Sequence, residues 1–296
     1  MLTVEDAFRK FRSRLELNSK EQDNVTARHT EMRSVLRIAF DVETDFLTGS
    51  YRRYTKTKPL QDVDFLCVLG KGERFRRKEH PSNLLDAFVD VLRKEYGSSA
   101  VTKHDRSVEV DFGVVADAED NTDYRVISME AVPAFTLGEN YEIPDGPHNQ
   151  WIKTNPKVHE DKALEAQNKF DGEWKGIVRM LKYWNNHNGK TVQPSFLLEV
   201  MALGCLHAPY AGNFPDEFQA LFATLADRMF ESWPDPAGLG PDISQDMTTA
   251  MRTTAKAALQ SASKSAGNAK HLTRTGKNGD ALQAWRTIFG PKFPLS

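Results

Sequence analysis

The segment Asp62–Leu69 reads DVDFLCVL, in which two aspartates spaced by one residue begin an apolar run. A short apolar run of this kind is typical of a buried β-strand, and residues two apart on a strand point to the same face. Asp62 and Asp64 would therefore present two carboxylates side by side. Two such charges repel one another unless a cation lies between them. The sequence thus predicts a strand, and hence a sheet, whose first residues bind a metal ion.

Two further features extend this predicted site. Gly49 and Ser50 lie upstream of the strand and offer an open backbone turn and a hydroxyl to phosphate oxygens. Asp111 lies in a second strand-like stretch at 107–115, which we expect to pair with the first, and Glu109 on the same strand face is the alternative third carboxylate. Hard divalent ions such as Mg²⁺ take oxygen ligands and share them with substrate phosphates. Three carboxylates predict a two-metal site, where the ions activate an attacking hydroxyl and stabilise a leaving pyrophosphate.

The apolar periodicity of the chain predicts the other elements. We expect helix over residues 1–47, up to a stop at Gly49, and again over 82–97, with a short strand at 124–130 and a long loop over 140–150. The second half is expected to be mainly helical, with helices in the segments 170–184, 195–207, 214–232, 243–266 and 280–289. Helices and strands thus alternate in the first half, and only helices follow. This order indicates an α+β or α/β front half and a helical back half.

The composition narrows the class of protein. The 296 residues carry 39 Lys and Arg against 41 Asp and Glu, and this net charge of −2 argues against a globally basic nucleic-acid binder. No run of about 18 apolar residues is present, so no membrane span is expected, and the first residues lack the apolar core of a signal peptide. Cys67 and Cys205 are far apart in apolar surroundings and are expected to be reduced thiols. These features predict a soluble, cytoplasmic protein.

The charge is unevenly distributed along the chain. From Thr248 onward, eight Lys and Arg stand against one acid, Asp280, which gives this segment a charge of +7 and leaves −9 for the first 247 residues. A basic segment of this kind attracts triphosphates, nucleic acid or a partner protein. A solvated helical face is an equally good explanation.

Taken together, these motifs resemble a known superfamily. The leading helix followed by LTGSYRRYTKTKPLQDVDFLCVL is similar to the polymerase-β-like nucleotidyltransferases, whose motif is hG[GS], then [DE]h[DE]h and a later acidic strand residue. More narrowly, the chain resembles the CD-NTases of CBASS anti-phage systems, the bacterial relatives of cyclic GMP–AMP synthase and oligoadenylate synthetase. The segments that carry this narrower resemblance are IKTNPKVH at 152–159, MLKYWN at 180–185, PSFLLE at 194–199 and WRTIFGPKFP at 285–294.

The resemblance implies a fold and an activity. The implied fold is α+β, a polymerase-β-like core with a mixed sheet flanked by helices, packed on a C-terminal helical bundle. The core would span residues 1–160, with the N-terminal helix bracing the second lobe, and the helical domain would span 161–296. The implied activity is the Mg²⁺-dependent joining of nucleoside triphosphates, with ATP foremost, into a cyclic di- or trinucleotide messenger for antiviral defence, with release of pyrophosphate. Two Mg²⁺ ions would take part, with Mn²⁺ as a substitute.

The resemblance also implies roles for individual residues. Three aspartates would bind the metal ions, and the third would help to deprotonate the attacking ribose hydroxyl: Asp62, Asp64 and Asp111. The donor triphosphate would be held by the backbone at Gly49 and by the side chains of Ser50, Lys182 and Ser195, and Phe196 would stack on a base. From the residues alone, Lys182 shares a stripe with Lys175 and Arg179 that a solvated helix face also explains, and Ser195 is equally a first-turn residue of a helix.

Two other functions fit the same sequence. A linear oligoadenylate synthetase or an RNA-end nucleotidyltransferase would share the active-site residues. A nucleic-acid or partner-binding module on an inactive transferase fold is the non-enzymatic alternative. The resemblance leaves regulation open: it implies either constitutive activity or control by a HORMA-like protein, a conjugation factor or a nucleic-acid activator.

Overall fold

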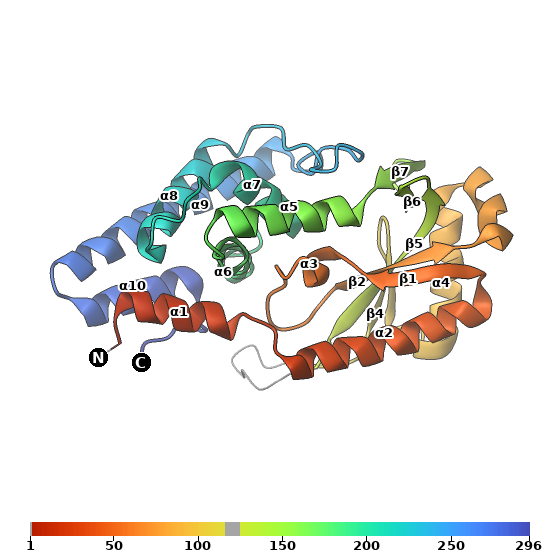
Figure 1. Ribbon diagram of the computed structural model, residues 1–296, viewed down its shortest axis with the longest axis horizontal. Helices are drawn as coiled ribbons and strands as arrows, with labels where there is room; N and C mark the ends of the chain where they lie inside the picture. The colour runs from red at the N-terminus through yellow and green to blue at the C-terminus, as the bar shows by residue number, and fades with distance from the viewer. Residues whose placement is uncertain (1, 116–124) are drawn as a thin grey trace. The chain divides into compact units, whose positions relative to one another are not determined.

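The computed structural model describes residues 2–115 and 125–296, and these divide into two compact units (Figure 1). One unit, here called the sheet unit, comprises residues 17–160 with 237–240. The other, the helical unit, comprises residues 1–16, 161–236 and 241–296. The first sixteen residues therefore belong with the second half of the chain. Helix α5 (Pro156–Lys169) begins in the sheet unit and continues into the helical unit.

The sheet unit is built on a mixed sheet with the strand order β1-β2-β5-β4-β3, extended by β6 and β7. Strands β2 and β5 run parallel, and the other neighbouring strands of the described sheet run antiparallel. The strands are β1 (Val42–Leu47), β2 (Val63–Leu69), β3 (Val101–Lys103), β4 (Val108–Asp111), β5 (Ser128–Leu137), β6 (Asn140–Asp145) and β7 (Gln150–Thr154).

Two helices of this unit bury one face of the sheet, α2 (Ser19–Ala39) and α4 (Pro81–Tyr96). The unit also contains the short α3 (Gly49–Arg52) and the 3₁₀ helix η1 (Lys71–Lys78). Phe65 and Cys67 of β2 point into the core formed with α2 and α4, because alternate residues of a strand face opposite sides. Leu66 belongs to a separate small cluster, so the intervening residues face the other way. Asp64 shares that parity with Leu66, and Asp62 lies immediately before the strand.

The helical unit has an aromatic core. Its helices are α1 (Val4–Arg14), α6 (Trp174–His187), α7 (Ser195–Cys205), α8 (Phe214–Asp227), α9 (Thr249–Arg274) and α10 (Asn278–Phe289). Phe8 of α1 is fully buried, and its ring packs against five aromatic rings of α8, of α10 and of the segment after α10. The distances between ring centroids are below 6 Å for Phe214, Phe218, Trp285, Phe289 and Phe293. These contacts explain why the N-terminal helix belongs to this unit.

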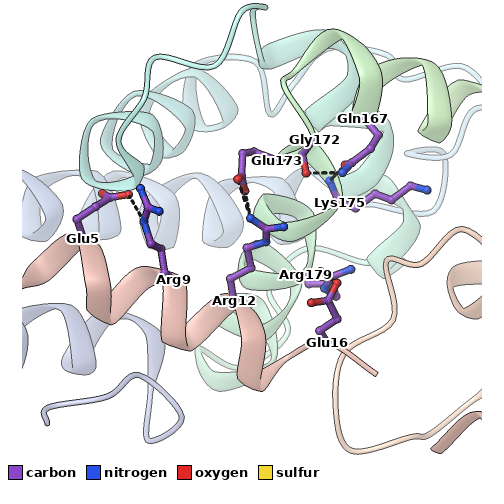
Figure 2. A network of polar contacts seen from close by, with 9 residues as sticks. All are labelled: Glu5, Arg9, Arg12, Glu16, Gln167, Gly172, Glu173, Lys175 and Arg179. Carbon is purple, nitrogen blue, oxygen red and sulfur yellow. Dashed lines mark hydrogen bonds and ion pairs between the residues drawn. The ribbon is translucent and has the colours of Figure 1, made fainter. Parts of the chain in front are cut away.

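A polar network joins α1 to α6 and to the turn before it (Figure 2). The guanidinium of Arg12 donates to both carboxylate oxygens of Glu173 at 2.6 Å, and that of Arg179 donates to Glu16 at 3.2 Å. Arg179 is 5% exposed, and burial lowers its pKa. Its partner Glu16 is the last residue of the helical unit before the chain enters the sheet unit. The network therefore fixes the point at which the chain leaves this unit.

Two sequence predictions in the front half are wrong. Helix α2 ends at Ala39, and residues 42–47 form the edge strand β1 rather than the end of a helix. Phe40 already has extended backbone angles, and the segment pairs with β2, so tertiary pairing overrides the apolar periodicity that runs on to Val42. The expected loop over 140–150 is instead the hairpin of β6 and β7.

The strand pairing also differs from the prediction. Strand β4 falls within the expected stretch 107–115, but it does not pair with β2, because β5 lies between them. The short strand expected at 124–130 is the start of β5, which runs from Ser128 to Leu137; Tyr124 lies outside the described residues. The predicted helix at 82–97 and strand at 62–69 correspond closely to α4 and β2.

None of the helices in the described ranges combines the length and the apolar character needed to cross a membrane. The thiols of Cys67 and Cys205 are both buried and free, and they lie in the cores of different units. Burial raises the pKa of the Cys67 thiol to about 12, so this group is an un-ionised core residue.

Candidate active site

One face of the sheet unit carries a row of carboxylates across three adjacent strands. Asp64 of β2 pairs with Glu130 of β5, and Glu130 pairs with Glu109 of β4. Residues that are directly opposite in a ladder project from the same face, and neighbouring strands are about 4.8 Å apart. Asp62, two residues before Asp64, lies at the same edge. We call this surface, defined by Asp62, Asp64, Glu109 and Glu130, the acidic face.

Glu130 is the residue that the sequence interpretation missed. Burial and, next to it, the charge of Asp64 raise the pKa of Glu130 to about 7. The side chain therefore lies in a place where a second negative charge is unfavourable without a compensating cation. A signal was available, because Glu130 is the one polar residue in the otherwise apolar stretch 129–135. A buried strand has no structural need of such a residue.

Asp111 and Glu109 lie one strand further from β2. Both belong to β4, and two strand spacings, roughly 10 Å, separate their backbone from that of Asp64. Asp111 is exposed, and its Oδ1 accepts the Gly113 N–H at 2.8 Å. The carboxylate of Glu109 lies 2.9 Å from Nε2 of His104. The register therefore brings Glu130, rather than either of these acids, beside Asp64.

Gly49 lies directly against the carboxylate of Asp64. A Cβ built on Gly49 would be 1.8 Å from Oδ2 of Asp64, and the backbone of Gly49 has φ +62°, which disfavours any other residue. The neighbouring Thr48 N–H donates to the Asp64 carbonyl at 2.9 Å. The Gly-Ser turn is thus packed onto the first residues of β2. Ser50 follows at the first turn of α3, half-buried.

The donor chemistry of the acidic face fits a hard divalent cation, since Asp62, Asp64 and Glu130 offer only carboxylate oxygens. Within the described ranges, no three His, Cys, Asp or Glu side chains already converge closely enough to hold an ion. The repulsion between Asp64 and Glu130 is the observation that favours a cation, because a divalent charge between them would remove it.

Lys182 is buried in the helical unit. It is 5% exposed, and its Nζ lies 2.5 Å from Oε1 of Glu199 on α7. Arg179 is equally buried, whereas Lys175 is half-buried. A solvated helix face therefore does not explain Arg179 or Lys182. The ammonium of Lys182 belongs to a buried ion pair.

Ser195 and Phe196 begin helix α7 of the helical unit. Ser195 is exposed at the first position of the helix, and Pro194 before it provides no side-chain cap. Uncapped N–H groups and the positive end of the helix dipole make this terminus suited to an anion. Phe196 is partly buried at the edge of the aromatic core. Both positions are compatible with the nucleotide-binding roles expected of them.

Comparisons with known proteins point to one family. Residues 1–168 match the model of the Second Messenger Oligonucleotide or Dinucleotide Synthetase domain. A probable cyclic nucleotide synthase of Bacillus cereus is 27% identical over 273 residues, covering 83% of this chain and 81% of that protein. A cyclic AMP-AMP-AMP synthase of an Acinetobacter species is 24% identical over 320 residues, covering 100% of this chain and 87% of that protein.

Solved structures show the same fold. The CdnC protein of Escherichia coli MS115-1 with ATP has a TM-score of 0.72, at 16% identity and with 98% of each chain covered. The same protein in a complex with HORMA has a TM-score of 0.71, at the same identity and coverage. The predicted α+β class, with a mixed sheet flanked by helices and a helical C-terminal region, is confirmed. The matched domain, which spans more than half of the sequence, shows that the chain belongs to the bacterial CD-NTases, the family of second messenger oligonucleotide or dinucleotide synthetases.

Proposed function

We propose that the protein condenses nucleoside triphosphates, including ATP, into a cyclic di- or trinucleotide and releases pyrophosphate. The observation that carries this proposal is the position of Glu130 beside Asp64, at the edge where Gly49 packs against the same carboxylate. An acidic pair next to a Gly-Ser turn provides metal ligands and a triphosphate site in one place. The names of the relatives, which make cyclic AMP-AMP-AMP or bind ATP, support adenosine as a base.

The acidic face would hold two divalent ions, Mg²⁺ or Mn²⁺. We assign them to Asp62, Asp64 and Glu130, since these residues lie on adjacent strands; Asp111, which the sequence suggested as the third ligand, lies one strand further away. When bound, the ions supply charge for the attacking oxygen and for the leaving pyrophosphate. Glu130, as one of these carboxylates, would also help to accept the proton of the attacking ribose hydroxyl.

Each unit also offers groups of its own for binding a nucleotide. The backbone at Gly49 and the hydroxyl of Ser50 would donate to the donor triphosphate. In the helical unit, the N-terminus of α7 with Ser195 would offer donors to a phosphate group, and Lys182, which is paired with Glu199, would offer a cation. Phe196, two residues beyond Pro194, would stack on a base.

Partners and context are part of the same proposal. The complex of the related CdnC with HORMA supports a HORMA-like protein as regulator. The resemblance to the CD-NTases of CBASS systems supports a role of the product in anti-phage defence. A linear oligoadenylate synthetase is the second candidate, because it needs the same carboxylates. Resistance of the product to phosphatase separates a cyclic product from a linear one.

The test is product analysis after incubation with all four nucleoside triphosphates and Mg²⁺. Mass spectrometry is expected to find a phosphatase-resistant cyclic oligonucleotide that contains AMP, formed by the wild type but not by D62N/D64N. The matched control is D90N, which removes one carboxylate from the exposed side of α4 in the same unit and is expected to leave the product unchanged. Product formed by D62N/D64N at the wild-type rate would contradict the proposal. A product that phosphatase degrades would favour the linear synthetase.

A further inference from the structure

Asp62 has an unusual backbone conformation for a non-glycine residue. Its φ is +47°, in the left-handed region, at the residue immediately before β2. Aspartate adopts this region only where its surroundings stabilise it. The hydroxyl of Ser128 supplies this stabilisation twice. It accepts the Asp62 N–H at 2.9 Å and lies 3.3 Å from Oδ1 of the same residue, to which it donates.

Ser128 lies at the start of β5 and is 2% exposed. The hydroxyl of Ser128 donates its single proton to the Asp62 carboxylate and accepts the Asp62 N–H with one of its lone pairs. The backbone of Asp62 and the direction of its carboxylate are therefore set by the same group. Met129, the next residue, pairs with Val63, so the ladder fixes the serine in this position.

A second buried serine contacts Glu130 in a similar way. Ser107 precedes β4 and is 5% exposed, and its hydroxyl donates to Oε2 of Glu130. The carbonyl of Ser107 accepts the His104 N–H at 2.9 Å, which closes the turn between β3 and β4. The glutamate side chain has more rotatable bonds than an aspartate, and this hydrogen bond removes part of that freedom.

We propose that Ser128 and Ser107 are positioning residues, each of which orients one carboxylate of the acidic face toward a divalent cation. This inference rests on the proposed function, since it takes Asp62 and Glu130 to be metal ligands. Hydrogen bonds to the outer side of a ligating group hold the ligand in the geometry that the metal requires, and their loss typically weakens metal affinity by about 10- to 100-fold. Neither serine touches the substrate in this scheme.

The direct test is Mn²⁺ affinity, measured by electron paramagnetic resonance in the presence of a non-hydrolysable ATP analogue. S128A and S107A are each expected to bind Mn²⁺ about 10-fold more weakly than the wild type. In turnover assays the same variants need more metal, while kcat at saturating Mg²⁺ is largely recovered. S107T and S128T, which keep the hydroxyl, are expected to bind Mn²⁺ like the wild type.

The matched control is S244A. Ser244 is 1% exposed, and its hydroxyl accepts the Trp233 N–H at 3.3 Å within the helical unit. Its loss is expected to lower the melting temperature much as the loss of the other two hydroxyls does, without changing Mn²⁺ affinity. Melting curves identify any variant that fails to fold, and the other serine then carries the test.

Two failures are distinguishable. A wild type that forms no cyclic product contradicts the proposed function. The positioning role alone is overturned if the wild type forms the product and the alanine variants of both serines bind Mn²⁺ as tightly as the wild type.

Discussion

Glu130 pairs with Asp64 across the parallel strands β5 and β2, so that two carboxylates project from the same face of the sheet on adjacent strands. Burial and the charge of Asp64 raise the pKa of Glu130 to about 7. In the proposed metal site, a bound cation would relieve the cost of holding these two charges together. This cost also makes the stability of the metal-free protein depend on pH.

The first prediction concerns this pH dependence. The pKa of Glu130 is about 7 in the folded chain against an ordinary value of 4.5, so the folded state binds the proton more tightly. This tighter proton binding contributes to the free energy of unfolding. The contribution is fully present below pH 4.5 and is lost as the pH rises through 7. E130Q is therefore expected to raise the free energy of unfolding of the metal-free protein at pH 8, by up to about 3 kcal/mol, and to change it little at pH 4.5.

Urea unfolding with a metal chelator present, at the two pH values, measures this effect. D90N is the control. It removes one negative charge, as E130Q does, but Asp90 is exposed and has no buried carboxylate beside it. An equal effect of E130Q at both pH values would contradict the raised pKa.

The second prediction concerns Gly49. G49A places a methyl group 1.8 Å from Oδ2 of Asp64, which must then move, and we expect product formation to fall by on the order of 100-fold. Gly138 is the matched control, since its φ of +61° is nearly the same but a Cβ there meets nothing within 4 Å. G138A is expected to cost about 1 kcal/mol of stability from backbone strain, with activity retained. Equal losses of activity in the two variants would show that strain, rather than the displaced carboxylate, is responsible.

Local patterns in the sequence were sufficient for part of this site. The alternation of polar and apolar residues after Asp62 predicts β2 and places both aspartates on one face, because that pattern depends only on neighbouring residues. The pairing of strands depends on residues far apart in the chain, and no local signal shows that β5 lies between β2 and β4. For this reason the sequence points to Asp111, or to Glu109 on the same strand, as the third carboxylate and not to Glu130.

Similar limits apply to β1 and Lys182. The apolar periodicity of α2 continues to Val42, so the helix end at Ala39 is set by the pairing of the next residues with β2. The position of Lys182 on a basic stripe does not reveal that Glu199, seventeen residues later, lies 2.5 Å from its ammonium. Whether that stripe is buried depends on how the helices pack in the tertiary structure, which the sequence pattern of one helix does not show.

The third prediction concerns this ion pair. Removing one partner of a buried pair leaves an uncompensated charge, so E199L and K182M are each expected to destabilise the protein by about 3–5 kcal/mol. The double variant K182M/E199L removes both charges and is expected to recover most of that loss. Thermal or urea unfolding of the four proteins gives the coupling energy.

The double variant also tests the nucleotide role of Lys182. If its ammonium contacts the triphosphate, K182M/E199L folds but has a raised KM for ATP. A stable double variant with the wild-type KM would restrict Lys182 to a structural role.

The central claim is that Asp64 and Glu130 form the catalytic metal site. The most direct test compares the rates at which E130Q and D111N form the cyclic product at saturating Mg²⁺ and ATP. Both variants replace a carboxylate with an amide of nearly equal size, and both residues lie in the same unit. The geometry predicts that E130Q loses on the order of 100-fold or more in rate, whereas D111N stays within about 5-fold of the wild type. The reverse order, with D111N inactive and E130Q active, would contradict it.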